Sequence, residues 1–177
     1  MGEDDGLPCK KNRKREGKKE HPAHSIIDSQ SVKTVYVSED RGIDGGKKIK
    51  GRKRHIVVDT CGNILSVCVH AANIHDTKSG GNVFEKAKKK YRSIKGVCGD
   101  AGYRKTFVNF AKNLVGTVEI VEKGEKGWVA LPKRWIVERT ISWLSHSRRL
   151  SKDYEVLTKS AESMVMISHL ATLLRRF

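Results

Sequence analysis

The sequence lacks the features that mark secreted, membrane-spanning or zinc-stabilised proteins. It has no run of about 18 apolar residues, which a transmembrane helix would need, and no apolar stretch near its N-terminus resembling a secretory signal. Its four cysteines, Cys9, Cys61, Cys68 and Cys98, form no C-x-x-C pair. We therefore expect free thiols in a reducing, cytoplasmic environment and no contact with a membrane.

Positive charge is what the sequence has in excess. Lys and Arg number 36 against 20 Asp and Glu, which gives a formal net charge of +16 over 177 residues. Such a surplus repels itself, and it usually has an anionic partner. Charge alone would suit nucleic acid first and an anionic membrane surface second, and of these two we expect nucleic acid. An inert cationic surface is the remaining alternative.

The first 24 residues differ in composition from the rest of the chain. Residues 10–19 read KKNRKREGKK and show no apolar periodicity. We predict a basic flexible arm over residues 1–24. It would act either as a plain linker or as a direct contact to DNA.

Residues 25–157 carry the pattern of one α/β domain, and residues 158–177 that of a C-terminal helix packed on it. Strands are predicted at 25–28, 56–59, 64–69, 94–100 and 115–121. Helices are predicted at 76–91, 103–114, about 132–150 and about 160–175. Three meandering strands followed by alternating helices and strands predict a mixed five-stranded sheet flanked by helices. This is the element order of the RNase H-like fold.

Three carboxylates are candidates for metal chemistry. Asp28 and Asp100 each end a predicted strand, and adjacent parallel strands would bring them to one edge of the sheet, where open α/β sheets bind ligands. Glu138 lies on the polar face of a predicted helix, which it shares with Arg134 and Arg149. Three carboxylates suit Mg²⁺ or Mn²⁺. Any one of them alone is more often a solvated strand end or helix face, so the prediction rests on the set.

Several ordered strings surround these carboxylates. They are IIDSQSVKT at 26–34, GGKKIKGRKRH at 45–55, NIHD at 73–76, GDAGY at 99–103, VERT at 137–140 and RRLSKDYE at 148–155. Together they resemble the motifs of DDE-class insertion-sequence transposases, in the branch often called the IS-five family. The resemblance covers about residues 25–160.

The resemblance implies an RNase H-like catalytic domain of a bacterial DNA transposase. Asp28, Asp100 and Glu138 would be its catalytic and metal-binding residues, holding two Mg²⁺ or Mn²⁺ ions. The protein would cut and join strands of double-stranded DNA as a homo-oligomer, and it would be associated with the nucleoid in the cytoplasm.

The family's third motif often carries Tyr, Arg, Glu and Lys in that order. Arg134 matches the Arg, but Leu131 stands in place of the Tyr and Ser145 in place of the Lys. Arg148, Arg149 or Lys152 would then have to replace the missing Lys.

Residues 47–54 hold six basic residues in eight positions, in a predicted hairpin. Such a hairpin could clamp a phosphate backbone independently of sequence; the alternative is a charged edge that blocks strand pairing. The DNA contacts that we predict are Lys33, Lys47, Lys48, Lys50, Arg52, Lys53, Arg54, Arg134, Arg148, Arg149 and Lys152.

Relatives implied by the resemblance commonly carry an N-terminal domain that recognises the ends of the element, whereas 27 residues precede Asp28. We therefore expect the downstream half of a frameshifted product, with an upstream frame product as a partner. One alternative is an inactive, truncated transposase that binds DNA nonspecifically or inhibits a full-length partner. Another is an RNase H-like nuclease that acts on branched or hybrid nucleic acid.

Overall fold

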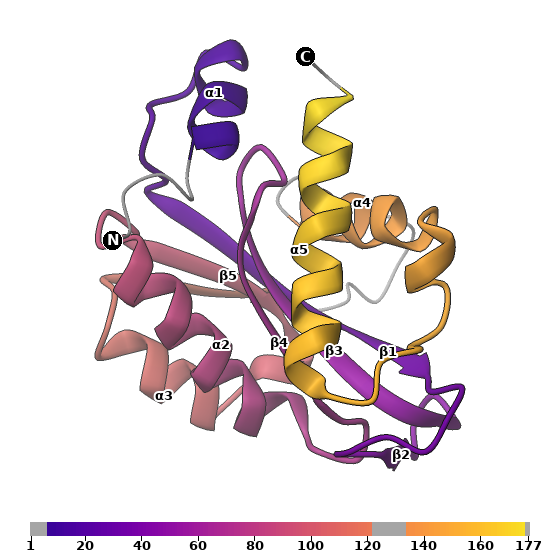
Figure 1. Cartoon of the computed structure of the whole chain (residues 1–177). Helices are drawn as coiled ribbons and strands as arrows, with labels where there is room; N and C mark the ends of the chain where they lie inside the picture. Colours follow the sequence, from indigo (N-terminus) through magenta and orange to yellow (C-terminus); the bar gives the residue numbers. More distant parts are fainter. Residues whose placement is uncertain (1–6, 122–133, 176–177) are drawn as a thin grey trace, which may run out of the picture.

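The computed structural model describes residues 7–121 and 134–175. A central sheet of six strands organises the described part of the chain (Figure 1). The strands are β1 (His24–Lys33), β2 (Gly42–Asp44), β3 (Ile49–Asp59), β4 (Ile64–Ala71), β5 (Gly96–Asp100) and β6 (Thr117–Val121). β3, β1, β5 and β6 follow one another across the sheet, and both β2 and β4 pair with β3. β1 runs antiparallel to β3 and parallel to β5.

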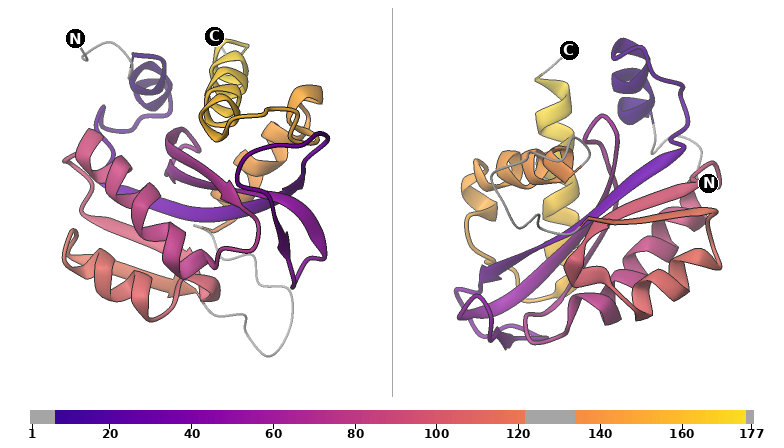
Figure 2. Two further views of the ribbon diagram at one scale, coloured as in Figure 1. Left: turned by 60° about the horizontal axis from the view of Figure 1, so that its bottom comes forward. Right: turned by 180° about the vertical axis from the view of Figure 1, so that it is seen from behind.

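Helices cover both faces of this sheet (Figure 2). They are α1 (Leu7–Arg15), α2 (Asp76–Lys90), α3 (Thr106–Lys112), α4 (Arg134–Ser145) and α5 (Thr158–Leu174), with 3₁₀ turns η1 (Ala101–Tyr103) and η2 (Arg148–Leu150). α2 and α3 lie on one face, α4 and α5 on the other. The predicted mixed sheet flanked by helices is confirmed, with the short β2 as an additional strand. None of the helices described has the length and apolar character needed to cross a membrane.

Alternation along β1 assigns its side chains to the two faces. Ile26 packs into the core under α4 and α5, and Ile27 into the core under α2 and α3. Successive side chains of a strand point to opposite faces. Asp28 therefore shares the α4 face with Ile26, while Ser29 faces α2.

Both β1 and β3 are longer than the sequence predicted. β1 continues to Lys33, so Asp28 lies inside the strand, opposite Ile56 of β3, and does not end it. β3 begins at Ile49, and its basic residues Arg52, Lys53 and Arg54 are buried. This burial does not favour the predicted DNA contacts of these three residues, because their side chains bind groups inside the protein.

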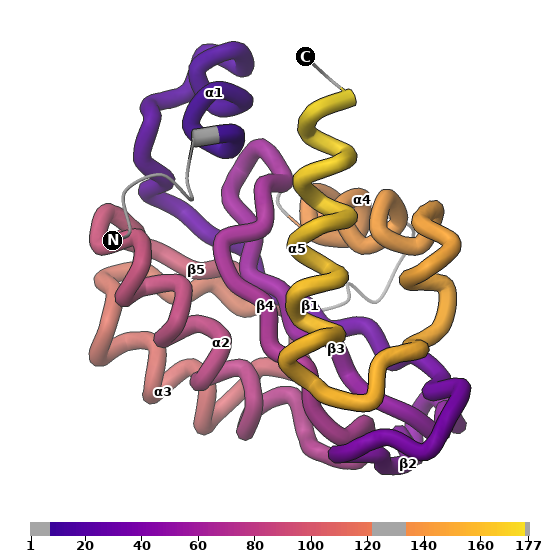
Figure 3. Tube along the Cα trace, in the orientation of Figure 1, coloured from indigo at the N-terminus to yellow at the C-terminus, as the bar shows by residue number. Residues whose placement is uncertain are grey.

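The N-terminal segment also differs from the flexible arm that was predicted. α1 packs near the β3–β4 turn, at the same end of the molecule as the C-terminal part of α5 (Figure 3). Arg13 Nη1 lies 2.7 Å from Asp59 Oδ2, and Asn12 Nδ2 donates to Asn63 Oδ1 at 2.7 Å. These contacts are polar, so the sequence of α1 shows no apolar periodicity from which its packing could be predicted.

A close contact joins α2 to the 3₁₀ turn after β5. A Cβ atom placed on Gly80 would lie 2.7 Å from Cε1 of Tyr103, far inside van der Waals contact. Glycine within a helix costs about 1 kcal/mol relative to alanine. Here it lets the buried Tyr103 ring pack directly against the helix backbone.

Candidate functional site

The register of two parallel strands places Asp28 beside Asp100. Ile26 of β1 pairs with Cys98 of β5, and both belong to the core under α4. Asp28 and Asp100 each follow two residues later on the same face. The structure thus brings together the first two carboxylates of the predicted triad.

Asp28 is a carboxylate with little to stabilise its charge. Burial, followed by the nearby charge of Asp100, raises the pKa of Asp28 to about 6. The backbone N–H of Ser29 donates to Asp28 Oδ1 at 2.7 Å and opposes this shift. Arg134 and Lys47 also act to lower the pKa, at longer range. Two adjacent carboxylates in such surroundings favour a bound cation.

The third carboxylate approaches from α4. Arg134 Nε lies 3.1 Å from Glu138 Oε1, and Arg134 Nη2 lies 3.8 Å from Asp100 Oδ2. The Glu138 side chain is 52% exposed. Arg134 therefore connects Glu138 to Asp100 through a guanidinium group. No three acidic, His or Cys side chains converge closely enough to hold a metal ion within residues 7–121 and 134–175.

The donor chemistry fits a divalent cation at Asp28 and Asp100, whose oxygens are hard ligands. Asp100 Oδ1 already accepts from the backbone N–H of Gly102 at 2.9 Å, which orients its carboxylate. Glu138 could join such a site once its carboxylate leaves Arg134.

A second polar cluster lies behind Asp28, on the α2 face. Asp76 Oδ1 lies 3.0 Å from Lys53 Nζ and 3.4 Å from His55 Nε2, and it accepts from Ser29 Oγ at 3.1 Å. Tyr103 Oη is 3.0 Å from His55 Nδ1. Burial lowers the pKa of His55 and raises that of Tyr103, which favours a neutral pair. His75, and not Asp76, is the N-cap residue of α2.

The opposite face of β3 holds the segment that follows α4. Arg52 Nη1 donates to Glu155 O at 2.9 Å and lies 3.4 Å from Asp153 Oδ2. Arg54 Nη1 donates to Leu150 O at 2.8 Å. The basic string of β3 therefore binds segments on both sides of the sheet, which explains its burial. The sequence spacing alone could not reveal partners about 100 residues away in the chain.

The other residues predicted to contact DNA remain at the surface. Lys33, Lys47, Lys48, Lys50, Arg148, Arg149 and Lys152 are exposed, and Arg134 is half-buried. Arg149 Nη2 lies 2.6 Å from Glu155 Oε1. Ser145, which stands where Lys was expected, accepts from Gln30 Nε2 at 3.0 Å. Leu131 lies outside the described residues.

Comparison with known proteins identifies a family whose sequence profile matches this chain. The sequence profile described as "Transposase DDE domain" matches residues 19–174. No curated protein matches the chain significantly.

Solved structures share the fold. The catalytic core domain of BIV integrase is similar with a TM-score of 0.51 at 10% identity, over 84% of this chain and 82% of that chain. A chain of the simian T-cell lymphotropic virus intasome, in complex with PP2A regulatory subunit B56 gamma, gives a TM-score of 0.57 at 14% identity. That match covers 82% of this chain and 48% of the other. At these identities the likeness shows the RNase H-like fold alone.

Proposed function

This chain belongs to the transposase DDE domain family, and on that premise we propose that Asp28, Asp100 and Glu138 serve metal-dependent DNA strand cleavage and strand transfer. The family is one of polynucleotidyl transferases. The observation that carries the proposal is the parallel register of β1 and β5, which sets Asp28 and Asp100 side by side on the face covered by α4.

Mg²⁺ or Mn²⁺ suits these ligands, and a bound pair of ions supplies activation of the attacking oxygen and stabilisation of the leaving one. Asp28 and Asp100 would hold the ions between them, and Glu138 would complete the ligand set. Asp28 is partly buried, which strengthens its attraction to a cation. No covalent bond between protein and DNA is needed, because water and then a 3′-hydroxyl act as the nucleophiles.

Arg134 has two partners in the structure and a different task in the reaction. Its guanidinium lies against Glu138 and near Asp100. If Glu138 bound a metal ion, the guanidinium of Arg134 would be free to donate to a phosphate oxygen, to which arginine donates in a bidentate manner. Arg134 would then hold the phosphate next to the metal ions.

The exposed lysines of the β2–β3 hairpin lie on the DNA path that we propose. The charge of Lys47 is one of the smaller influences that lower the pKa of Asp28. Lys33, Lys48 and Lys50 are exposed on the adjoining strands and turn. On the other flank, Arg148, Arg149 and Lys152 follow α4. Contacts of these residues to backbone phosphates would position the DNA without reading its sequence.

Joining two DNA ends requires at least two active sites, so we propose that the protein works as a homo-oligomer on DNA. One of the similar solved structures is that of an intasome. Sedimentation of the protein with and without duplex DNA tests this point. A monomer on DNA at concentrations that support strand transfer would contradict it.

The function is tested by Mg²⁺-dependent nicking and strand transfer on duplexes that carry the element's ends. Wild type should cleave and join, whereas Asp100→Asn and Glu138→Gln should fall to background. Asp40→Asn is the matched control, because Asp40 is an exposed carboxylate outside the site. Activity that is equal in wild type and Asp100→Asn would refute the assignment.

The Arg134–Glu138 contact also favours a second candidate function, a DNA-binding but inactive protein in which the third carboxylate stays paired. Wild type would then bind duplex DNA, show no cleavage with Mg²⁺ or Mn²⁺, and inhibit an active full-length transposase. Cleavage by wild type that is lost in Glu138→Gln rules out this alternative.

A further inference from the structure

α1 is a basic helix held in a defined place. It contains no acidic residue, and Lys11 and Lys14 are exposed on it. The loop that follows adds exposed Lys18 and Lys19. Lys14 lies 3.3 Å from Glu20, whereas Lys11, Lys18 and Lys19 make no ion pair within the described part of the chain.

A buried polar anchor fixes these lysines in orientation. The side chains of Arg13 and Asp59 are 6% and 0% exposed, and their ion pair measures 2.7 Å. Arg13 Nε also donates to the carbonyl of Lys19 at 2.7 Å, so one guanidinium holds both the helix and its loop. Burying an ion pair costs desolvation energy. Because α1 has few apolar side chains, this ion pair is what holds the helix in place. The lysines of α1 and of the following loop are therefore held in fixed positions.

The same array continues onto the end of α2. Ser93 Oγ donates to Pro22 O at 2.8 Å, and the N–H of Lys95 donates to Ala23 O at 2.7 Å, which joins the loop after α1 to the segment after α2. Lys90 and Arg92 are exposed there. The charge of Lys90 reaches the thiol of Cys9 on α1. We call this surface the basic end; its cations are Lys11, Lys14, Lys18, Lys19, Lys90 and Arg92.

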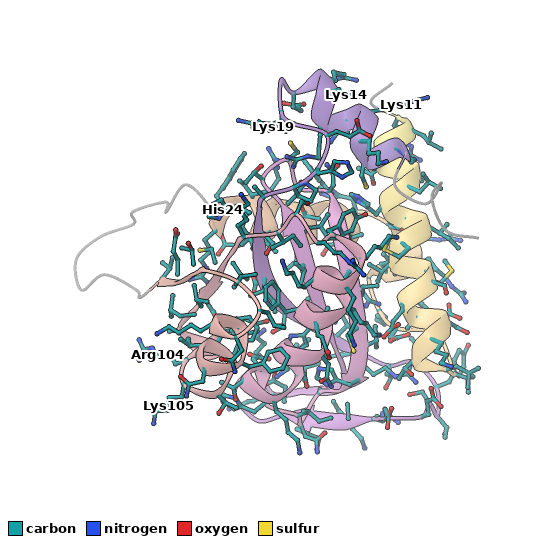
Figure 4. The ribbon with its side chains drawn as sticks, turned by 90° about the vertical axis from the view of Figure 1, so that its left-hand side faces the viewer. Lys11, Lys14, Lys19, His24, Arg104 and Lys105 are labelled. Carbon is teal, nitrogen blue, oxygen red and sulfur yellow. The ribbon has the colours of Figure 1, made fainter. Side chains whose placement is uncertain are left out.

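The basic end lies away from the carboxylates. β5 starts beside it at Gly96 and finishes at Asp100, about 13 Å further along at the usual rise of a strand. α2 starts near the site at Asp76 and reaches Lys90 about 21 Å later. Figure 4 shows Lys11, Lys14 and Lys19 together at one end and Arg104 and Lys105 at the other. The basic end is thus separate from the exposed lysines of the β2–β3 hairpin.

The chemistry of this surface fits a polyanion with evenly spaced charges. Duplex DNA carries one negative charge per about 1.7 Å of its axis, so it can meet several of these lysines at once. An anionic membrane would call for apolar side chains that enter the lipid, and none of the six named cations supplies one. A protein partner would call for a central apolar or aromatic anchor, which the named cations do not provide.

We propose that the basic end binds the phosphate backbone of double-stranded DNA, independently of sequence, as a second DNA surface beside the catalytic site. The choice of DNA rests on the proposed function. The binding itself needs neither metal ions nor the three carboxylates, and it would anchor DNA that extends beyond the reacting phosphate.

The test measures affinity for a duplex several helical turns long, of a sequence unrelated to any element end, in EDTA and over a series of salt concentrations. The test variant is Lys11→Glu/Lys18→Glu/Lys19→Glu, because among the described residues these side chains have no ion pair for the substitution to break. We expect affinity to fall about tenfold or more, and the slope of log K against log salt to become shallower by about 3, one phosphate for each lysine.

Two controls accompany the triple variant. Lys11→Arg/Lys18→Arg/Lys19→Arg retains the charge, so it should bind as wild type does. Lys159→Glu adds negative charge at an exposed position of α5 outside the basic end, and it should change the affinity little. The same comparisons in an Asp100→Asn background should give the same differences.

An unchanged affinity and salt slope in the glutamate variant would overturn the proposal. So would binding of anionic vesicles, or of single-stranded RNA, through these lysines without binding of duplex DNA. Failure of the proposed function would look different, because a protein without strand cleavage would still lose DNA affinity in the glutamate variant.

Discussion

Arg134 Nε lies 3.1 Å from Glu138 Oε1, one helical turn along α4. The second nitrogen contact of Arg134, to Asp100, is 3.8 Å long. One guanidinium thus occupies the position between two of the carboxylates proposed to bind metal. Partly exposed ion pairs contribute at most about 1 kcal/mol, so a divalent ion can compete for Glu138 at little cost.

Removing this competitor should strengthen metal binding. We expect Arg134→Gln to bind Mg²⁺ about threefold to tenfold more tightly, the equivalent of a weak ion pair. Its strand cleavage should nevertheless slow, because the phosphate contact is lost. Mg²⁺ titration by calorimetry and cleavage at saturating Mg²⁺ check the two effects, with Lys112→Gln as control. Mg²⁺ affinity equal to or weaker than that of wild type would contradict the prediction.

Asp28 should make the metal-free protein less stable as pH rises. Burial and then Asp100 raise the pKa of Asp28 to about 6. The unfolded chain has a lower pKa, about 3.9. The folded state therefore holds the proton more tightly, and its advantage disappears as pH rises from about 4 through about 6. Asp28→Asn should be more stable than wild type at pH 8 by on the order of 3 kcal/mol, and close to it near pH 4.

Urea denaturation in EDTA over this pH range measures the effect, with the exposed Asp40→Asn as control. Added Mg²⁺ at pH 8 should raise the stability of wild type more than that of Asp28→Asn. A stability difference between Asp28→Asn and wild type that does not vary with pH would show that burial does not perturb this carboxylate.

Arg52 should be essential to stability even though it lies in a basic motif. Arg52→Met would leave Asp153 and several carbonyls without their donor. Loss of one partner of a buried pair typically costs about 3–5 kcal/mol. Lys50→Met, two residues earlier on β3 and exposed, should change stability by less than about 0.5 kcal/mol. Chemical denaturation measures the free energy of unfolding of the two variants. Equal losses would mean that the buried contacts of Arg52 do not stabilise the protein.

Two neighbouring glycines of α2 should respond in opposite ways to alanine. Gly80→Ala puts a methyl group 2.7 Å from the Tyr103 ring, which should destabilise the protein by about 1–3 kcal/mol. At Gly81 the nearest atom is 3.4 Å away, so Gly81→Ala should be neutral or gain up to about 1 kcal/mol of helix propensity. Thermal melts compare the stabilities of the two variants. A Gly80→Ala protein as stable as Gly81→Ala would contradict the close packing of Gly80 against Tyr103.

The sequence could predict the sheet and its helices because most strands and helices show their apolar pattern. It could also place Asp28 near Asp100, because both follow apolar runs that pair in parallel. It could not predict the full extent of β3, since buried arginine and lysine look like solvent-exposed residues until their distant carbonyl partners are known. α1 could not be predicted for the same reason, because the ion pair of Arg13 with Asp59 that holds it forms only in the folded chain.

The position of Glu138 shows a further limit. Its pairing with Arg134 follows from the spacing of four residues on a helix. The approach of Arg134 to Asp100 is a tertiary contact, and no local pattern encodes it.

The alternation of side chains along β3 has a consequence for changes in the length of the gene product. Arg52 and Arg54 serve one layer of helices, Lys53 and His55 the other. Inserting or deleting a single codon within this stretch would exchange the two sets, sending every charge to the layer without its partner. The turn at residues 45–48 has no such constraint. Spontaneous indels in this coding region should therefore be tolerated at the turn and eliminated in the strand that follows it.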